Sequence, residues 1–308
     1  MPATPLPNDS LWPRAGEWLR IASGPDDSGD LSLLGVPAHE RSLTASGAHL
    51  TPAAVRDALM RYSPFAASHD LDLTTLSAVD LGDVTDPDGE GGEDRVSALA
   101  TSAHARFELL LAVGGDNSMT YPLMLGVSTG ALDGWGLITV DAHHDLRDGA
   151  SNGSPVRRLL GAGLPGTHVV QIGIADFANS AAYSTRAQEQ GITVIGRDEL
   201  RRIDVSVVAA RALAIAGESG RPIYVDLDVD VCDRAEAPGC PASAPGGITA
   251  DDLRQIAFLL ASDSRVAAID VAEIDATADA PDQRTVRLGA LLVLEVAAGL
   301  AMRLQRRT

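Results

Sequence analysis

The sequence contains no lysine, and all 24 of its basic residues are arginines. A chain without lysine cannot form a Schiff base with pyridoxal phosphate, and it cannot build the lysine-bearing loop that holds nucleotide phosphates. Cysteine is scarce as well: Cys232 and Cys240 are too few for a disulfide framework and are typical of a reducing compartment. Long apolar runs and an amino-terminal secretion signal are also missing. We therefore expect a cytoplasmic protein without a membrane span.

Basic residues are fewer than acidic ones, so the formal net charge is −18 and the sequence pI is near 4.6. Such a surface repels nucleic acids and anionic lipids, so neither is an expected partner. At 308 residues, 45% of them hydrophobic, the chain is long enough for one large core. We expect a single domain over residues 1–308, with an N-terminal extension at 1–30 and a polar, glycine-rich surface loop at 85–94.

Short apolar runs rich in valine, isoleucine and leucine occur along the whole chain, with helical stretches between them. Such runs are typical of parallel strands that are buried on both faces of a sheet. About eight runs fit this pattern: 31–36, 77–81, 108–113, 136–141, 168–172, 192–195, 222–228 and 266–271. Alternating strands and helices predict an α/β fold, with three α/β/α layers around a central, mostly parallel sheet of about eight strands.

Five of the helical stretches can be bounded from the sequence: 51–62, 94–106, 180–190, 205–216 and 249–260. Thr51 precedes Pro52, and Thr249 precedes two aspartates. Threonine is a good N-cap, and proline and acidic residues are common in the first helical turn. We therefore expect Thr51 and Thr249 to cap their helices.

Acidic residues alternate with others at the ends of two predicted strands, on the edge where open parallel sheets bind their ligands. The alternating set after the strand at 136–141 is Asp141, His143 and Asp145, and that of the strand at 222–228 is Asp226, Asp228 and Asp230. An extended chain places alternate residues on one side. Several carboxylates on one buried face would be costly without a cation. Carboxylates mixed with imidazole suit Mn²⁺ well, and Zn²⁺ or Fe²⁺ less well.

The acidic clusters also allow two interpretations that involve no catalytic metal. The aspartates at 226–230 could belong to a calcium loop, but Val231 stands where that loop needs glycine, and Ala237 stands where it needs glutamate. The clusters could instead be solvated aspartates without a function. Solvated aspartates account less well for two clusters on one edge of a sheet than for either cluster alone.

Three motifs together resemble those of the arginase, agmatinase and formimidoylglutamase family, the ureohydrolases: Gly-Gly-Asp-Asn-Ser at 114–118, Asp-Ala-His-His-Asp at 141–145, and Asp-Leu-Asp-Val-Asp-Val-Cys-Asp at 226–233. The likeness covers most of the chain in motif order. It implies an arginase-like fold, two Mn²⁺ ions per chain and a homo-oligomer. It further implies that Asp141 and Asp228 bridge both ions, that Asp145 completes the first ion's shell, and that His143 and Asp230 complete the second's.

The chain departs from the family pattern at three positions. Asn117 stands where the family has a metal-binding histidine, and its side-chain oxygen could occupy the same coordination position as a weak ligand. The alternative is that the first metal is labile or absent. Asp226 stands where the family usually has serine, so we interpret it as a neighbour of the ligands. Asn152 to Ser154 replace a segment with a proton-shuttling histidine and resemble the corresponding segment of formimidoylglutamases.

The resemblance and the strand-end positions also suggest roles toward a substrate. Glu273 follows the last predicted strand, where a carboxylate could hold a cationic amidinium group. Arginine binds carboxylates through two parallel hydrogen bonds. The expected catalytic residues are Asp141, His143 and Glu273. The expected substrate-binding residues are Arg147, Asn152, Ser154, Arg157 and Glu273.

Formimidoylglutamase is the branch of the family that the sequence favours. The resemblance implies hydrolysis of N-formimidoyl-L-glutamate, a small-molecule amidine, to L-glutamate and formamide by a hydroxide that bridges the two Mn²⁺ ions. An agmatinase-like or guanidino-acid hydrolase, which would release urea, is one alternative. A catalytically weak family member that acts as a binding protein is another.

Overall fold

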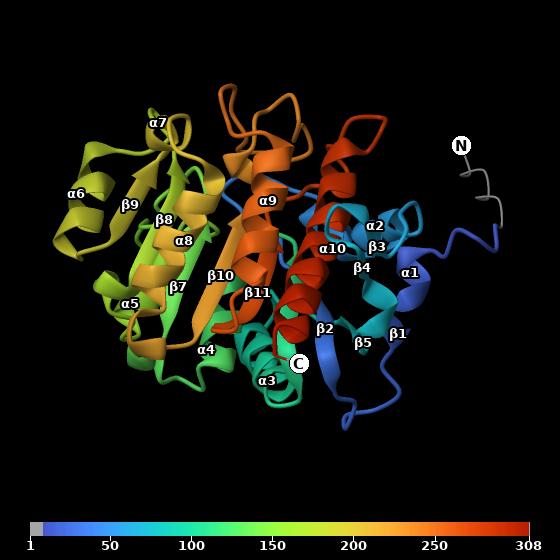
Figure 1. Ribbon diagram of the computed structural model, residues 1–308. Coiled ribbons are helices and arrows are strands. Elements are labelled where there is room, and N and C mark those ends of the chain that lie inside the picture. Colours follow the sequence, from blue (N-terminus) through green and yellow to red (C-terminus); the bar gives the residue numbers. More distant parts are fainter. Residues whose placement is uncertain (1–8, 308) are drawn as a thin grey trace.

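The computed structural model describes residues 9–307, in which a central sheet lies between two layers of helices (Figure 1). Within that range the sheet has nine strands in the order β1-β5-β2-β6-β11-β10-β7-β8-β9, and neighbouring strands pair in parallel. The strands are β1 (Arg20–Ile21), β2 (Gly29–Val36), β5 (Ala78–Asp83), β6 (Phe107–Gly114), β7 (Gly136–Val140), β8 (Val169–Ile174), β9 (Thr193–Gly196), β10 (Ile223–Asp228) and β11 (Val266–Ala272). This architecture confirms the predicted fold class.

The sheet is buried on both faces because helices cover both of them. The helices are α1 (Ala15–Trp18), α2 (Thr51–Leu59), α3 (Gly92–His104), α4 (Thr120–Val127), α5 (Pro155–Gly161), α6 (Ala181–Glu189), α7 (Arg197–Leu200), α8 (Val205–Ala216), α9 (Ala250–Ala261) and α10 (Arg284–Gln305). Side chains of α2, α8, α9 and α10 share one hydrophobic cluster with the sheet, whereas those of α3, α4, α5 and α6 share the other. A short antiparallel pair, β3 (Phe65–Ala66) and β4 (Leu71–Asp72), contacts α10 through β4.

Each of the eight predicted apolar runs overlaps one strand of the sheet. The ninth strand, β1, lies within the expected N-terminal extension and pairs with β5 through two exposed residues. Residues 1–8 of that extension lie outside the described part of the chain. Residues 84–91 connect β5 to α3, which begins at Gly92, inside the expected loop at 85–94.

Only one of the two expected helix caps is present. Thr249 is the N-cap of α9 and forms a capping box with Asp252. Thr51 is wrong as an N-cap, because Leu50 takes that place and Thr51 is the first residue of α2. The buried hydroxyl of Thr51 instead donates to the backbone oxygen of Ile274, so it ties α2 to the segment after β11.

Within the described residues, α10 is long and apolar enough to cross a membrane by length and composition alone. However, 72% of its most apolar window is buried inside the molecule. Figure 1 shows α10 beside α9 on one face of the sheet, where both helices belong to the same hydrophobic cluster. This burial is typical of the core helix of a folded domain.

The strand order determines where the chemistry lies. Strand β10 is in the middle of the sheet and pairs with β7 on one side and β11 on the other, while β11 also pairs with β6. The strands are parallel, so the segments that follow β6, β7, β10 and β11 all emerge at one edge. These segments are distant in sequence, and the sheet brings them together.

Candidate metal centre

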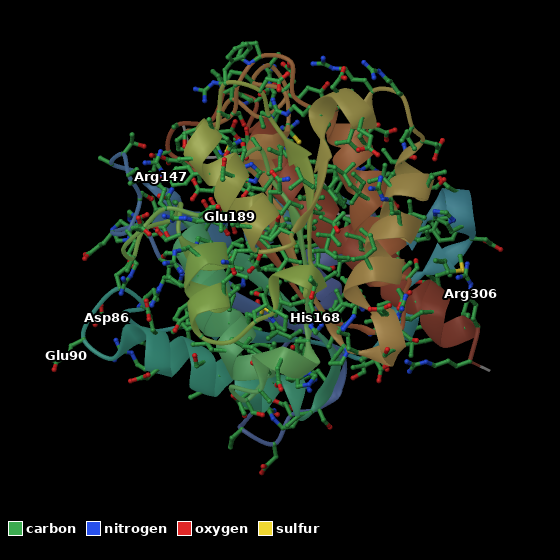
Figure 2. All side chains as sticks on the ribbon, turned by 90° about the vertical axis from the view of Figure 1, so that its left-hand side faces the viewer. Asp86, Glu90, Arg147, His168, Glu189 and Arg306 are labelled. Carbon is green, nitrogen blue, oxygen red and sulfur yellow. The ribbon has the colours of Figure 1, made fainter. Side chains whose placement is uncertain are left out.

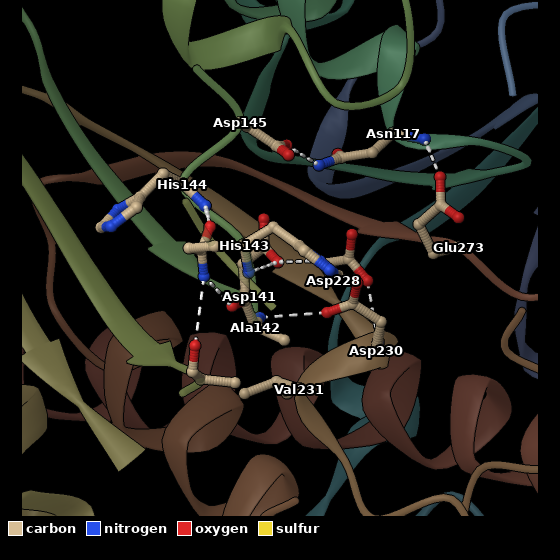
Figure 3. A network of polar contacts seen from close by, with 12 residues as sticks. Asn117, Asp141, Ala142, His143, His144, Asp145, Asp228, Asp230, Val231 and Glu273 are labelled. Atoms are coloured by element: carbon tan, nitrogen blue, oxygen red, sulfur yellow. Dashed lines mark hydrogen bonds and ion pairs between the residues drawn. The ribbon is translucent and has the colours of Figure 1, made fainter. Parts of the chain in front are cut away.

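Acidic side chains gather where β7 and β10 end (Figure 3). Asp141 follows the last residue of β7, and Asp228 is the last residue of the neighbouring β10. The chain turns immediately after Asp228, and the backbone N–H of Asp230 donates to Asp228 Oδ1 at 2.8 Å. His143 and Asp145 lie in the loop after Asp141, and all four aspartates are buried. The structure thus brings together five of the residues that the sequence predicts as ligands.

The possible ligand atoms fall into two overlapping sets. Asp141, His143 and Asp230 offer atoms within 4.8 Å of one another, and Asp141, Asp145 and Asp226 do the same. In the first set, His143 Nδ1 lies 2.6 Å from Asp230 Oδ2 and 3.5 Å from Asp141 Oδ1. These are ion-pair distances between the imidazole and the two carboxylates, and a cation bound by the same atoms would take the place of the proton between them. Asp141 belongs to both sets, so its carboxylate lies between two candidate positions.

Crowding of the carboxylates changes their protonation. Burial, together with repulsion by Asp230, raises the pKa of Asp141 to about 7. Burial and neighbouring carboxylates also raise the pKa of Asp145 and of Asp228 well above the ordinary range. Burial opposes a charge on His143, but hydrogen bonds to Asp141 and Asp230 raise its pKa to about 11. A protonated His143 thus supplies positive charge that a divalent cation would replace, with release of the proton.

An unpaired oxygen supports the same interpretation. Asp141 Oδ2 is buried and has no hydrogen-bond partner within residues 9–307. Leaving a buried polar atom without a partner costs about 1–3 kcal/mol, and more for a charged group. A divalent cation between the carboxylates would satisfy that oxygen and lower the repulsion. The donor set therefore fits a divalent metal that accepts both carboxylate oxygen and imidazole nitrogen.

Glu273 lies beside these aspartates, directly after β11. Its Oε1 accepts hydrogen bonds from the backbone N–H of Asn117 at 2.8 Å and from Asn152 Nδ2 at 3.0 Å. Burial, followed by the charge of Asp116, raises the pKa of Glu273 to about 8. Glu273 has a φ of 65° and Asp145 a φ of 52°, in the left-handed region that strains residues other than glycine. Strain of this kind concentrates at functional sites.

The side chain of Asn117 turns its nitrogen toward the carboxylates. Asn117 Nδ2 donates to Asp145 Oδ2 at 2.6 Å and lies 3.5 Å from Asp226 Oδ2. Its Oδ1, the atom that could bind a metal, accepts instead from Thr120 Oγ1 at 2.7 Å. In this arrangement Asn117 is a hydrogen-bond donor to the acidic cluster.

The expected substrate-binding residues on the loop at 147–157 differ in their surroundings. Arg147 is exposed, and within residues 9–307 its guanidinium has no hydrogen-bond or ion-pair partner; Figure 2 shows it at the molecular surface. Arg157 is partly exposed and lies 3.4 Å from Asp148. Ser154 is fully buried, with its hydroxyl 2.9 Å from that of Ser151, so it stabilises its own turn. Arg147 is therefore the arginine of this loop with a free guanidinium.

Part of the buried hydrogen-bond network behind the acidic cluster lies outside the three sequence motifs. Asp270 belongs to none of them, and it is the Cα partner of Asp226 on the neighbouring strand. Both are fully buried. Asp270 Oδ2 accepts a hydrogen bond from the hydroxyl of Tyr224 at 2.6 Å and lies 2.8 Å from Thr120 Oγ1. The signal in the sequence is that each of two apolar runs, 222–228 and 266–271, contains a carboxylate among its apolar residues, since a buried charge needs a specific partner.

The sequence profile described as the arginase family matches residues 29–299. A formimidoylglutamase from Halalkalibacterium halodurans is 37% identical over 87% of this chain and 86% of its own length. One from Halobacterium salinarum is 32% identical over 97% of this chain and 96% of its own length. The chain belongs to the arginase family, which confirms the resemblance seen in its motifs.

The solved structures are similar to this chain along nearly its whole length. The formimidoylglutamase of Bacillus subtilis has a TM-score of 0.89 and 29% identity, and the match covers 98% of this chain and 96% of that one. The formiminoglutamase of Trypanosoma cruzi, solved with Mn²⁺, has a TM-score of 0.86 and 24% identity, covering 94% and 99%. Within the family, the sequence relatives and the Bacillus subtilis structure point to the formimidoylglutamase branch.

Proposed function

We propose that this chain hydrolyses N-formimidoyl-L-glutamate to L-glutamate and formamide, with two Mn²⁺ ions per chain. The observation that carries the proposal is the buried cluster around Asp141, where two donor sets share one carboxylate. Formimidoylglutamases among the relatives, at up to 37% identity, support the choice of substrate. Water adds to the amidine carbon across its C=N bond. The C–N bond to the glutamate nitrogen then breaks, the formimidoyl carbon leaves as formamide, and the proton goes to the amino group of glutamate.

The residues that would hold the ions are the buried aspartates and His143. Asp141 lies between the two positions, and Asp228 lies beside it at the end of β10. Asp145 would complete the first position, and His143 with Asp230 the second. When bound, such ions lower the pKa of a coordinated water to about 7. Hard carboxylates with one imidazole favour Mn²⁺ over Mg²⁺ or Ca²⁺, which bind histidine poorly.

Glu273 and Asn152 have roles toward the amidine group in this proposal. Glu273 Oε1 is held by the two hydrogen bonds from Asn117 and Asn152, which fixes the carboxylate and leaves Oε2 for the substrate. An amidinium cation would form a charge-assisted hydrogen bond there. The charge of Glu273 acts on Asp145 and Asp228, so the amidine carbon would then lie on the side of the cluster that these two carboxylates form. Glu273 would thereby orient the substrate for attack by water.

Arg147 would bind the far end of the substrate. Formimidoylglutamate carries two carboxylates, and the guanidinium of Arg147 has no partner within residues 9–307. Arg157, by contrast, already lies near Asp148. A cationic substrate such as agmatine would be repelled by a free arginine at this place. The charge of the loop therefore favours a substrate with a carboxylate.

The test is a substrate panel with the Mn²⁺-loaded protein. Formimidoylglutamate, agmatine, arginine and 3-guanidinopropionate are incubated separately, and glutamate, formamide and urea are measured. We expect glutamate and formamide from the first compound only. Asp141→Asn should lower that rate more than about 100-fold, because loss of a ligand is worse than loss of its supporting hydrogen bonds. A metal-loaded protein that leaves formimidoylglutamate intact would overturn the proposal.

A guanidino-acid hydrolase is the second candidate. A guanidinopropionase from Pseudomonas aeruginosa is 32% identical over 88% of this chain and 86% of its own length. A guanidino acid also has a carboxylate that Arg147 could bind. Release of urea from 3-guanidinopropionate, without glutamate from formimidoylglutamate, would favour this candidate.

We also propose that the protein is a cytoplasmic homo-oligomer. The scarcity of cysteine and the resemblance to the family support this proposal. Size-exclusion chromatography with light scattering should give a multiple of the 31.9 kDa chain mass. A mass of one chain at micromolar concentration would contradict it.

A further inference from the structure

Asn179 lies on the loop between β8 and α6 and belongs to none of the sequence motifs. Its side chain binds the loop after β7, in which His143 stands between Ala142 and His144 (Figure 3). Asn179 Oδ1 accepts from the backbone N–H of His144 at 2.9 Å, and Asn179 Nδ2 donates to the backbone oxygen of Ala142 at 2.9 Å. That oxygen also accepts from the backbone N–H of Ala175, whereas the N–H of His144 has Asn179 alone within residues 9–307. One carboxamide thus binds the peptide groups on both sides of His143.

A second carboxamide holds the same loop from inside the sheet. Gln171 is fully buried on β8, the strand that pairs with β7. Gln171 Nε2 donates to the backbone oxygen of His144 at 3.0 Å, and Gln171 Oε1 lies 2.7 Å from His144 Nδ1. The imidazole of His144 therefore binds the sheet and anchors the loop.

The backbone of this loop matters because little else holds the imidazole of His143. The side chain of His143 is 30% exposed, and its Nδ1 contacts Asp230 and Asp141. Its Nε2 has no hydrogen-bond partner within residues 9–307. A histidine that binds a metal usually donates its other ring nitrogen to a neighbour, and that bond fixes the ring. Without it, the direction of the imidazole depends on where the backbone places the residue.

The same peptide groups also contact the other side chain of the second metal position. The backbone N–H of Ala142 donates to Asp230 Oδ1 at 3.0 Å. Ala142 thus binds Asp230 through its amide group and Asn179 through its carbonyl group. A shift of the loop would displace His143 and Asp230 together.

The carboxylates of the first position have anchors of their own. The backbone N–H of Asp141 donates to the backbone oxygen of Ile172 at 2.9 Å, as a continuation of the pairing between β7 and β8. Asp145 Oδ2 accepts from Asn117 Nδ2 at 2.6 Å. Neither contact involves Asn179, so loss of its carboxamide should affect the two positions unequally.

We propose that Asn179 is a positioning residue that fixes His143 for the second metal position, with Gln171 supporting the loop from the sheet. The inference rests on the proposed function for the presence of the metal ions. Outer residues that orient metal ligands typically change metal affinity about 10-fold to 100-fold when they are replaced. The effect of Asn179 should therefore be a selective loss of affinity at one of the two positions.

The test measures metal binding, so it needs no substrate. Mn²⁺ is titrated into the chelated protein by isothermal titration calorimetry, and the bound ions are examined by electron paramagnetic resonance. Two neighbouring Mn²⁺ ions give a broadened, coupled spectrum, whereas a single bound ion does not. We expect two ions in the wild type. Asn179→Ala should bind one ion as the wild type does and the other about 10-fold to 100-fold more weakly, and the coupled spectrum should be lost at Mn²⁺ concentrations between the two Kd values.

Ser184→Ala is the matched control. Ser184 and Asn179 line the same open cavity of about 560 Å³, and Ser184 Oγ lies 3.4 Å from His144 Nε2. In the described part of the chain, however, the Ser184 side chain does not bind the backbone of the loop at 142–145. We expect Ser184→Ala to bind both ions as the wild type does.

The substitution of Asn179 should leave the fold intact, because the residue is partly exposed and its loss creates no buried hole. Circular dichroism of the chelated variants checks this. Should Asn179→Ala fail to fold, Asn179→Ser takes its place, since a serine hydroxyl is too short to bind both peptide groups at once. It should show the same selective loss.

Wild-type affinity for both ions in Asn179→Ala, or an equal loss for both, would overturn the inference. If the wild type binds a single ion, the two-metal part of the proposed function fails, and an unchanged affinity for that ion in Asn179→Ala overturns the inference as well. If metal affinities follow the expectation while formimidoylglutamate is left intact, the inference stands and the proposed substrate fails.

Discussion

Arg147 is the single side chain on which the choice of substrate depends most directly. It is exposed, and within residues 9–307 its guanidinium is free, so a bound carboxylate would gain a charge-assisted contact without breaking an existing one. Hydrogen bonds to charged groups contribute about 1.5–3 kcal/mol. The residue therefore supplies binding energy at little cost to the fold.

Arg147→Ala should raise KM for formimidoylglutamate about 10-fold to 100-fold, the equivalent of about 1.5–3 kcal/mol, and leave kcat within a few-fold. Steady-state kinetics of the Mn²⁺-loaded variant measure both values. Arg157→Ala serves as the control and should change KM less, since Arg157 lies beside Asp148. Equal effects of the two substitutions would show that neither arginine is specific for the carboxylate.

Glu273 makes the metal-free protein sensitive to pH. Burial, with the charge of Asp116, raises its pKa to about 8 from an ordinary value of 4.5. Between these values the folded chain holds a proton that the unfolded chain has lost. The free energy of unfolding must therefore fall as pH rises from about 4.5 to about 8, by at most about 1.4 kcal/mol per pH unit for this group.

Glu273→Gln removes that titration, so the variant should gain stability relative to the wild type as pH rises. Urea unfolding in the presence of a chelator, at pH 5.5, 7 and 8.5, gives the difference at each pH. We expect it to grow across this window and to become constant above about pH 9. A difference that does not depend on pH would mean that Glu273 is charged in the folded chain at pH 5.5.

The ligand candidates were predictable from the sequence because they follow a local rule. Asp141, His143 and Asp145 alternate at the end of an apolar run, and this pattern alone places them together at a strand end. The contact of Asn117 with Asp145, and the place of Asp226 in the second donor set, could not be predicted. Both depend on how neighbouring strands of the sheet are aligned and on the rotation of the Asn117 amide. A pattern of nearby residues in the sequence predicts neither.

At the scale of the elements, α10 depends on one buried arginine near its last turn. The guanidinium of Arg303 donates to the backbone oxygens of Asp263, Val266 and Glu108, which precede or begin β11 and β6. Arg303 is 3% exposed. It therefore fixes the end of α10 to the amino-terminal ends of the strands, which lie on the opposite side of the sheet from the metal centre.

Arg303→Met should lower the free energy of unfolding by roughly 1–3 kcal/mol or more, because buried carbonyl oxygens lose their donors. Arg306→Met, one turn further along at an exposed position, is the control and should have little effect. Denaturant unfolding measures both. An Arg303→Met variant as stable as the wild type would show that water replaces the guanidinium.

Element prediction succeeded where the pattern was strong and failed where packing decides. The eight apolar runs are strands because each is a continuous apolar segment between polar ones. Strand β1 is only two residues long and both are exposed, so no apolar pattern in the sequence indicates it. Thr51 has the sequence of an N-cap, but its hydroxyl finds a buried partner in the segment after β11, and the N-cap falls one residue earlier.

At the scale of the whole molecule, the metal centre is also a stabilising cross-link between two parts of the chain. Asp141 and His143 precede β8, whereas Asp228 and Asp230 follow more than 80 residues later on β10 and the turn after it. Ions that bind only the folded state raise its stability, by about 2.7 kcal/mol when the free metal is at 100 times its Kd. Metal binding and folding should therefore be thermodynamically coupled.

Added Mn²⁺ should raise Tm of the chelated protein in a concentration-dependent way, and Mg²⁺ should raise it less because of the imidazole. Thermal unfolding followed by circular dichroism measures the shift. Asp141→Asn, which removes the carboxylate common to both donor sets, should abolish most of it. The same shift in wild type and variant would mean that Mn²⁺ binds elsewhere.

The strand order has a consequence for the way the chain is synthesised. Strands β1, β2, β5 and β6 emerge from the ribosome first, then β7, β8 and β9, yet β6 and β7 are separated in the finished sheet by β10 and β11. Until residue 272 has emerged, two half-sheets each expose an unpaired edge, and such edges are prone to aggregate. The last strands of the sheet to be translated close this gap and complete the ligand set in the same step, so a nascent chain gains its metal site only when its sheet becomes whole.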